Sequence, residues 1–351
     1  MVEWKRRIVG DRNNSVDRDA VAAWLGARAD ITPPLRLTTI AGGRSNLTYD
    51  VQDADGRRFV LRRPPLHGVL SSAHDMERES RIISALADSA VPVPAVIGFE
   101  PDEAVIGAPF FVMRFVPGEV LRSGSDVEAH LDVSSRATTG ENVIDVLVEL
   151  HRVDPLAVGL GDLVRRSPYL SRQLRRWHGQ LVQSRTRELP VLDAVHARLA
   201  AGRPPEPEAV IVHGDYRLDN LIVDPTNGRV AAVLDWELTT VGDPRMDLAT
   251  LLAYWSAADE ALTALPDPPT LLPGFPHRER LLQRYGQLTG RDLDAMPYFM
   301  AFAYWRLACI LEGVYSRYRA GAYGTHSAGF DQVGERVEML GERALELIGA
   351  G

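Results

Sequence analysis

The sequence predicts an α+β chain in two parts: a small strand-rich N-terminal part with one key helix, and a larger, mostly helical part. Three observations support this prediction. Residues 35–61 form short segments in which apolar and polar side chains alternate. Turns that contain glycine separate these segments, as in an antiparallel sheet. From residue 117 onward, apolar residues recur mainly at helical spacing. Within this second part, the segments AVIVHGDYRLDNLIVD and GRVAAVLDWE indicate short strands next to a loop.

The composition bounds the class of protein. The 351 residues are 45% hydrophobic and 25% charged, which is ordinary for a soluble globular protein. The net charge of -8 argues against a nucleic-acid partner, because a phosphate backbone requires a basic face. We interpret this charge mainly as an aid to solubility, with tolerance for a cationic substrate as the alternative. No apolar run reaches the roughly 18 residues that cross a bilayer, so we expect a cytoplasmic protein without a membrane segment. The oligomeric state stays open.

Helical periodicity places the remaining elements. In the first part it predicts a helix at 16–28 and the key helix at 73–88. In the second part it predicts helical stretches at 141–152, at 168–200 and over most of 246–348. The strands and the loop between them therefore lie in the middle of a helical region.

The most informative segment is HGDYRLDN, which lies between two apolar strands and is therefore held rigidly. Phosphoryl transfer needs a carboxylate that orients the acceptor hydroxyl and an oxygen ligand for Mg²⁺. Asp215 suits the first role, and Asn220 suits the second. Asp235 ends the apolar strand VAAVLD and supplies a further Mg²⁺ ligand. Either segment alone could be a turn or a helix cap, but their order and spacing favour the catalytic interpretation.

HGDYRLDN followed by LDWE resembles the aminoglycoside phosphotransferase and choline kinase families, which are relatives of the protein kinases. The likeness is strongest to the kinase-like domains associated with acyl-CoA dehydrogenases. It implies a bilobal protein-kinase-like fold, with an N-lobe at 1–115, a C-lobe at 116–351, and nucleotide and Mg²⁺ bound between them. It also implies that His213 supports the catalytic loop and that Asp247 braces it.

The resemblance further implies a nucleotide site upstream. A glycine-rich turn, with Gly42, Gly43, Ser45 and Asn46, would donate hydrogen bonds to the phosphates. Alone, such a turn is usually only a hairpin. The segment PFFVMRFVPGE resembles the linker between kinase lobes, whose backbone reads the base.

Two charged residues are expected to pair in the N-lobe. Arg62, on the strand FVLRR, stands where a protein kinase has lysine. Glu79 lies on the apolar stripe of the helix at 73–88, where a carboxylate is costly unless a cation meets it. The alternative is that Glu79 lies at the wet edge of this stripe. In the linker, Met113 and Phe115 are the candidate base contacts, with ATP as the default nucleotide and GTP left open.

The predicted reaction moves the γ-phosphoryl group of ATP to a hydroxyl of a small molecule. The alternative is a pseudokinase, or a metabolite-binding protein without turnover, because Arg62 replaces the usual lysine. Aminoglycosides, choline-like alcohols, sugars, hydroxy amino acids and hydroxyacyl compounds all fit an aspartate-based site. Arg306, Glu312 and Arg317 lie on an otherwise apolar helix, where substrate contact and packing are both open.

Overall fold

The computed structural model describes residues 16–40, 46–65, 72–165, 167–256, 267–320 and 330–349. These residues divide into two compact units, which we call unit 1 and unit 2. Unit 1 contains the described residues up to Ala87 together with Val93–Val116. Unit 2 contains Asp88–Pro92 and the described residues from Pro117 onward.

Unit 1 is built on a five-stranded sheet in the order β1-β2-β3-β5-β4. Each pair of neighbouring strands is antiparallel, as the alternating pattern and glycine turns predict. The register of β2 against β3 places Arg62 opposite Thr48. The strands are β1 (Arg36–Thr39), β2 (Leu47–Gln52), β3 (Arg58–Arg63), β4 (Val96–Glu100) and β5 (Phe110–Arg114).

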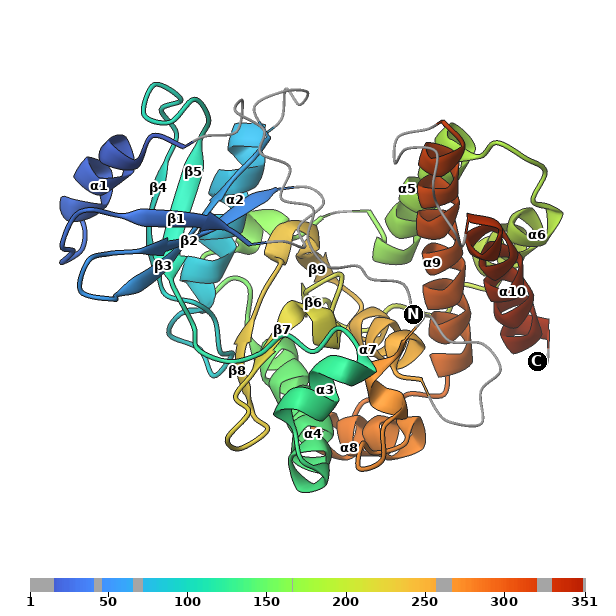
Figure 1. Cartoon of the computed structure of the whole chain (residues 1–351). Helices are drawn as coiled ribbons and strands as arrows, with labels where there is room; N and C mark the ends of the chain where they lie inside the picture. Colours follow the sequence, from blue (N-terminus) through green and yellow to red (C-terminus); the bar gives the residue numbers. More distant parts are fainter. Residues whose placement is uncertain are drawn as a thin grey trace. The chain divides into compact units, whose positions relative to one another are not determined.

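Helices cover both faces of this sheet (Figure 1). Helix α1 (Arg18–Gly26) packs on one face, where Phe59 and Leu61 are fully buried. Helix α2 (Ser72–Leu86) packs against β4 and β5 on the other face. Because side chains alternate along a strand, Arg62 points to the α2 face of the sheet. The strand pattern thus positions a cation toward α2.

Unit 2 is mostly helical and contains two small two-stranded sheets. This mixture confirms the predicted α+β class. One sheet pairs β6 (Val210–Val212) with β9 (Thr240–Gly242), and the other pairs β7 (Leu221–Val223) with β8 (Val230–Val233). The helices are α3 (Gly124–His130), α4 (Val133–Arg152), α5 (Tyr169–Ser184), α6 (Pro190–Ala201), α7 (Arg245–Tyr254), α8 (Arg278–Thr289), α9 (Met296–Arg319) and α10 (Phe330–Gly349).

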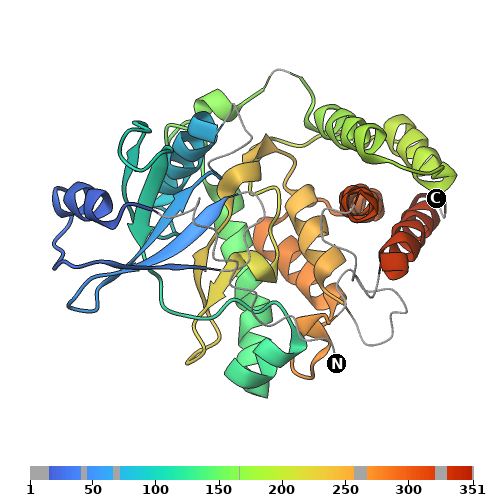
Figure 2. The same cartoon turned by 45° about the horizontal axis from the view of Figure 1, so that its top comes forward.

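The helical stretch predicted at 168–200 is interrupted, because α5 ends at Ser184 and α6 begins at Pro190. Proline lacks an N–H and is tolerated in the first turn of a helix, so it marks a new start. Helix α9 lies among the C-terminal helices and packs against α5, α6, α7 and α10 (Figure 2). Within the described ranges, no helix combines the length and apolar character that a membrane crossing requires.

Candidate active site

The segment HGDYRLDN forms the loop between β6 and β7, and its last residues make a short 3₁₀ helix, Leu218–Asn220. Gly214 has a φ of +86°, a conformation that glycine adopts without strain. A Cβ at this position would lie 2.7 Å from the carbonyl oxygen of Leu238. The loop therefore approaches the chain after β8 too closely for any other residue.

Asp247, on α7, fixes the backbone of this loop through hydrogen bonds. Its side chain is buried and accepts hydrogen bonds from the backbone N–H groups of His213, at 2.6 Å, and Gly214, at 2.8 Å. It also lies 3.4 Å from Nε2 of His151, whose Nδ1 is 2.7 Å from the Tyr285 hydroxyl. Burial raises the pKa of Asp247, but the hydrogen bonds from His151 and from the Gly214 N–H help to outweigh it, so the net shift is downward. Asp247 is thus held as a buried anion.

His213 connects the loop to the end of β8. Its Nδ1 accepts a hydrogen bond from the Asp215 N–H at 3.2 Å, so the proton must be on Nε2, which donates to the Leu234 carbonyl at 2.8 Å. The fully buried ring also packs edge-on against Trp236, with centroids 4.8 Å apart. His213 therefore orients the backbone that carries Asp215 and makes no use of its own acid–base chemistry.

Asp215 and Asn220 meet directly. The Asn220 Nδ2 donates to the Asp215 carbonyl at 2.8 Å and to Asp215 Oδ2 at 3.0 Å. Both amide protons are thereby used, and neither Asn220 Oδ1 nor Asp215 Oδ1 accepts a hydrogen bond from another described residue. The backbone carbonyl of Asn220 also accepts from the Leu234 N–H at 2.8 Å, so the residue before Asp235 lies beside Asn220.

Asp235 has a φ of +66°, and it is the one non-glycine residue with positive φ within the described segments. Left-handed backbone costs an L-residue roughly 1–2 kcal/mol, and such strain is concentrated at functional sites. The donor set fits Mg²⁺, because an amide oxygen and a carboxylate are hard ligands and Mg²⁺ takes its other ligands from phosphates and water. No group of three or more His, Cys, Asp or Glu side chains suited to a metal occurs in the part that the structure describes.

Two arginines that the sequence did not assign to the site flank Asp215. Arg217 Nε lies 3.4 Å from Asp215 Oδ2, and Arg306 Nη2 lies 3.7 Å from Asp215 Oδ1. Arg217 is inside the motif and could have been noticed there. Arg306 is on α9, and a charged residue on an otherwise apolar helix is the sequence feature that could have indicated a place in the site. Its neighbour Glu312 instead pairs with Arg187 at 3.3 Å, which is a packing role.

Unit 1 carries the predicted phosphate-binding residues. Arg62 Nη1 lies 2.6 Å from Glu79 Oε1, and Glu79 is fully buried. Glu79 therefore does not lie at the solvent-exposed edge of the apolar stripe, and that alternative is wrong. Asn46 is half-buried immediately before β2, whereas Gly42, Gly43 and Ser45 lie outside the described residues.

The two candidate base contacts differ in their backbone surroundings. Met113 is buried within the sheet, between Val60 of β3 and Val96 of β4. Phe115 follows β5, and its N–H donates to the Arg58 carbonyl at 3.3 Å. This N–H is therefore engaged inside unit 1.

Comparisons with known proteins identify the family of the chain. A model of the phosphotransferase enzyme family matches residues 36–297. Acyl-CoA dehydrogenase family member 10 of Mus musculus is 36% identical over 316 residues, which cover 89% of this chain but 29% of that protein. The chain thus spans under a third of that relative's length.

Solved structures show the same fold. A Ralstonia eutropha structure, assigned provisionally to the aminoglycoside phosphotransferases, is 32% identical with a TM-score of 0.81, covering 96% of this chain and 99% of that one. An aminoglycoside phosphotransferase solved with streptomycin and ATP has a TM-score of 0.56 at 18% identity, covering 85% and 94% of the two chains. The resemblance drawn from HGDYRLDN and LDWE is confirmed, and the chain belongs to the phosphotransferase enzyme family.

Proposed function

We propose that the protein transfers the γ-phosphoryl group of ATP to a hydroxyl of a small molecule in a Mg²⁺-dependent reaction. The observation that carries this proposal is the hydrogen bond between Asn220 Nδ2 and Asp215 Oδ2, on a loop that Asp247 fixes by two backbone hydrogen bonds. This arrangement uses Asp215 Oδ2 and the Asn220 amide protons, and it leaves Asp215 Oδ1 and Asn220 Oδ1 without a hydrogen bond among the described residues. It matches what phosphoryl transfer needs, which is positioning and charge stabilisation.

Each group then has a defined task. Asp215 Oδ1 accepts a hydrogen bond from the acceptor hydroxyl and receives its proton as the oxygen attacks the γ-phosphorus. The new O–P bond replaces the bond to the β,γ-bridging oxygen, and ADP leaves. Asn220 Oδ1 and Asp235 would hold Mg²⁺, which supplies charge neutralisation for the phosphates. Arg62, oriented by Glu79, would bind the phosphates; Arg62 is always charged, so the missing lysine does not remove the positive charge.

Support for the choice of nucleotide comes from the ATP complex of the streptomycin-binding fold neighbour. The sequence identity of 18% to that protein carries the fold alone, so the nucleotide is part of the proposal. Asp215 supports the choice of an alcohol acceptor, because a carboxylate can accept the proton of a hydroxyl.

The test is a phosphorylation screen of a metabolite pool with labelled ATP and Mg²⁺. The Asp215→Asn variant should lose about 10²–10⁴-fold in transfer rate, the range for removal of a positioned acid–base group. The Asp235→Asn variant should also lose transfer, because it removes a proposed Mg²⁺ ligand. Asp224→Asn is the matched control, because Asp224 lies in the β7–β8 turn and accepts from Thr226. Transfer that survives in both active-site variants would refute the proposed mechanism.

The non-catalytic alternative rests on one observation, the arginine at position 62. It predicts that MgATP binds with normal affinity while the wild type shows no more transfer than Asp215→Asn on any acceptor. The intact Arg62–Glu79 pair and the filled Asp215, Asn220 and Asp235 positions favour the enzyme.

A further inference from the structure

Helices α5 and α9 bring two guanidinium groups beside the catalytic loop. Arg176 of α5 and Arg306 of α9 line a small hollow together with Gly214, the residue next to Asp215. Both belong to unit 2, which also contains the whole loop. The chain has a net charge of -8, so this local positive charge runs against its overall balance.

The positive charge of Arg306 is only partly balanced by the described residues around it. Its side chain is only 9% exposed, and its Nε makes no hydrogen bond within the described residues. The acidic group at its end is Asp215 Oδ1, at 3.7 Å, which is beyond hydrogen-bond distance. The guanidinium of Arg306 stacks over the Trp177 ring, with its central carbon 4.8 Å from the ring centroid, and this contact fixes the orientation of the guanidinium. A buried guanidinium is costly unless an anion and hydrogen bonds satisfy it, so this position favours an anionic ligand.

Arg176 adds a second cation to the same place. It lies over the ring of Trp177, 5.4 Å from the centroid, so one indole orients both arginines. Arg176 is exposed at the surface, yet desolvation of its guanidinium and the charge of Arg306 lower its pKa, whereas Tyr169 and Glu237 oppose this shift. Two like charges repel each other, and an anion that pairs with both removes the repulsion.

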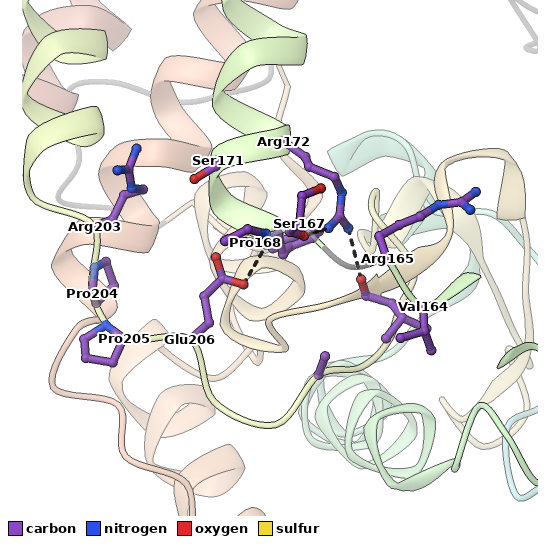
Figure 3. Close-up of a pocket in the computed structure, with 13 residues that line it drawn as sticks. Val164, Arg165, Ser167, Pro168, Ser171, Arg172, Arg203, Pro204, Pro205 and Glu206 are labelled. Carbon is purple, nitrogen blue, oxygen red and sulfur yellow. Dashed lines mark hydrogen bonds between the residues drawn. The ribbon is translucent and has the colours of Figure 1, made fainter. Parts of the chain in front are cut away.

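A larger cavity continues the positive surface on the other side of Tyr169, which lines both hollows. It has a volume of about 670 Å³ and is lined by Arg165, Arg172 and Arg203 (Figure 3). Its acidic residue, Glu206, accepts from the backbone N–H groups of Tyr169 and Leu170 at 2.8 and 2.9 Å. The carboxylate is thus already engaged by the start of α5.

We propose that the phosphoryl acceptor is an anionic hydroxy compound, whose carboxylate or phosphate group pairs with Arg306 and the exposed Arg176 while its hydroxyl faces Asp215 Oδ1. This inference rests on the proposed function. It replaces the tolerance for cationic substrates that the net charge suggested. With hydrogen bonds of roughly 2.8 Å at either end of the 3.7 Å gap, the anionic oxygen lies within about 9 Å of the hydroxyl oxygen. A short acceptor spans that distance.

The geometry also couples recognition to chemistry. Asp215 Oδ2 is engaged by Asn220, so the hydroxyl must approach Oδ1, which faces Arg306. When Arg306 pairs with the anion of the acceptor, its attraction for Oδ1 falls. Oδ1 then becomes a better hydrogen-bond acceptor for the hydroxyl, and a neutral alcohol would not produce this effect.

The first experiment measures anion binding without turnover. Inorganic phosphate is titrated into protein saturated with the Mg²⁺ complex of a non-hydrolysable ATP analogue, so that the γ-phosphate position is also filled. Tryptophan fluorescence is followed because Trp177 contacts both arginines. Arg306→Gln and Arg176→Gln should each weaken phosphate binding at least tenfold, and Arg306→Lys should recover part of it. Arg175→Gln, on the neighbouring exposed position of α5, is the matched control and should bind as the wild type does.

Two results of this titration would overturn the inference: a wild type that binds no phosphate at millimolar concentration, or glutamine variants that bind as tightly as the control. Arg176→Gln serves as the second variant, because Arg306 is buried and its loss could affect folding.

The second experiment identifies the charge of the acceptor. Products of the metabolite screen are analysed by mass spectrometry, and each should carry a carboxylate or phosphate besides the one transferred. Arg306→Gln should raise KM for that acceptor at least tenfold with a smaller change in kcat. Transfer to a neutral or cationic acceptor with unchanged KM in Arg306→Gln would refute the anionic class and leave phosphotransfer intact. Phosphate binding that depends on Arg306, with no transfer to any acceptor, would instead refute the proposed function alone.

Discussion

At the scale of single residues, the catalytic loop depends on buried groups that never touch substrate. Asp247 takes two backbone N–H groups of the loop, and His151 and Tyr285 extend this network into α4 and α8. A mutation in this network would move Asp215 only indirectly. Such residues therefore act by positioning the loop. The contribution of His151 to this network can be measured through the pH dependence of the free energy of unfolding.

His151 should make the protein less stable at mildly acidic pH. Burial is the largest cause that lowers the pKa of His151 below its usual 6.5, although Asp247 opposes it. Because the unfolded chain then binds more protons than the native one, the free energy of unfolding should fall as pH drops through about 6.5. Urea unfolding between pH 5.5 and 7.5 measures this slope.

The His151→Gln variant isolates the effect, since glutamine can still donate to Asp247 but does not titrate. It should show a shallower slope than the wild type over the same range. Equal slopes in the two proteins would show that His151 does not titrate differently in the native and unfolded states.

At the scale of elements, the loop between β6 and β7 should not tolerate a side chain at Gly214. A Cβ there would lie 2.7 Å from the Leu238 carbonyl, in addition to the strain of its positive φ. Gly159→Ala is the matched control, because its φ is +76° and nothing lies within 4 Å of an added Cβ. Gly159→Ala should cost about 1 kcal/mol of stability, and Gly214→Ala should cost clearly more and abolish transfer. Similar unfolding midpoints for both would contradict the close approach.

The contact between β3 and α2 should depend on a buried ion pair. Glu79→Ala removes the buried carboxylate that pairs with Arg62, and breaking a buried ion pair costs about 3–5 kcal/mol. Glu77→Ala, on the exposed face of α2, should change stability by no more than about 0.5 kcal/mol. Chemical denaturation compares the two, and KM for ATP should rise in Glu79→Ala alone.

The sequence predicts these elements unevenly, for physical reasons. Strand alternation and the stripe on α2 are local patterns, so the Arg62–Glu79 pair follows from them. Asp215 and Asn220 meet because both lie on the short loop between β6 and β7, and Asp235 follows β8, whose partner strand is β7. Arg306 could not be placed, since its position beside Asp215 arises from the packing of α9 against distant helices, which no local pattern records.

At the scale of the whole molecule, MgATP should stabilise the protein as a ligand of the native state. At a concentration of 100 times Kd it adds about 2.7 kcal/mol to the free energy of unfolding. Thermal unfolding with ATP and Mg²⁺ should show a higher Tm than unfolding with ATP and EDTA. Asp235→Asn should lose this difference, whereas Asp224→Asn should retain it. A Mg²⁺-dependent rise that persists in Asp235→Asn would exclude Asp235 as a metal ligand.

The left-handed backbone of Asp235 has one more consequence, which concerns evolution and engineering. Glycine at this position would relieve roughly 1 kcal/mol of strain, so selection for thermostability alone would replace the aspartate. A library screened for heat resistance should therefore enrich inactive glycine variants at position 235. A strained carboxylate that is retained at this position trades stability for activity, and the strain lies in the φ angle of one residue.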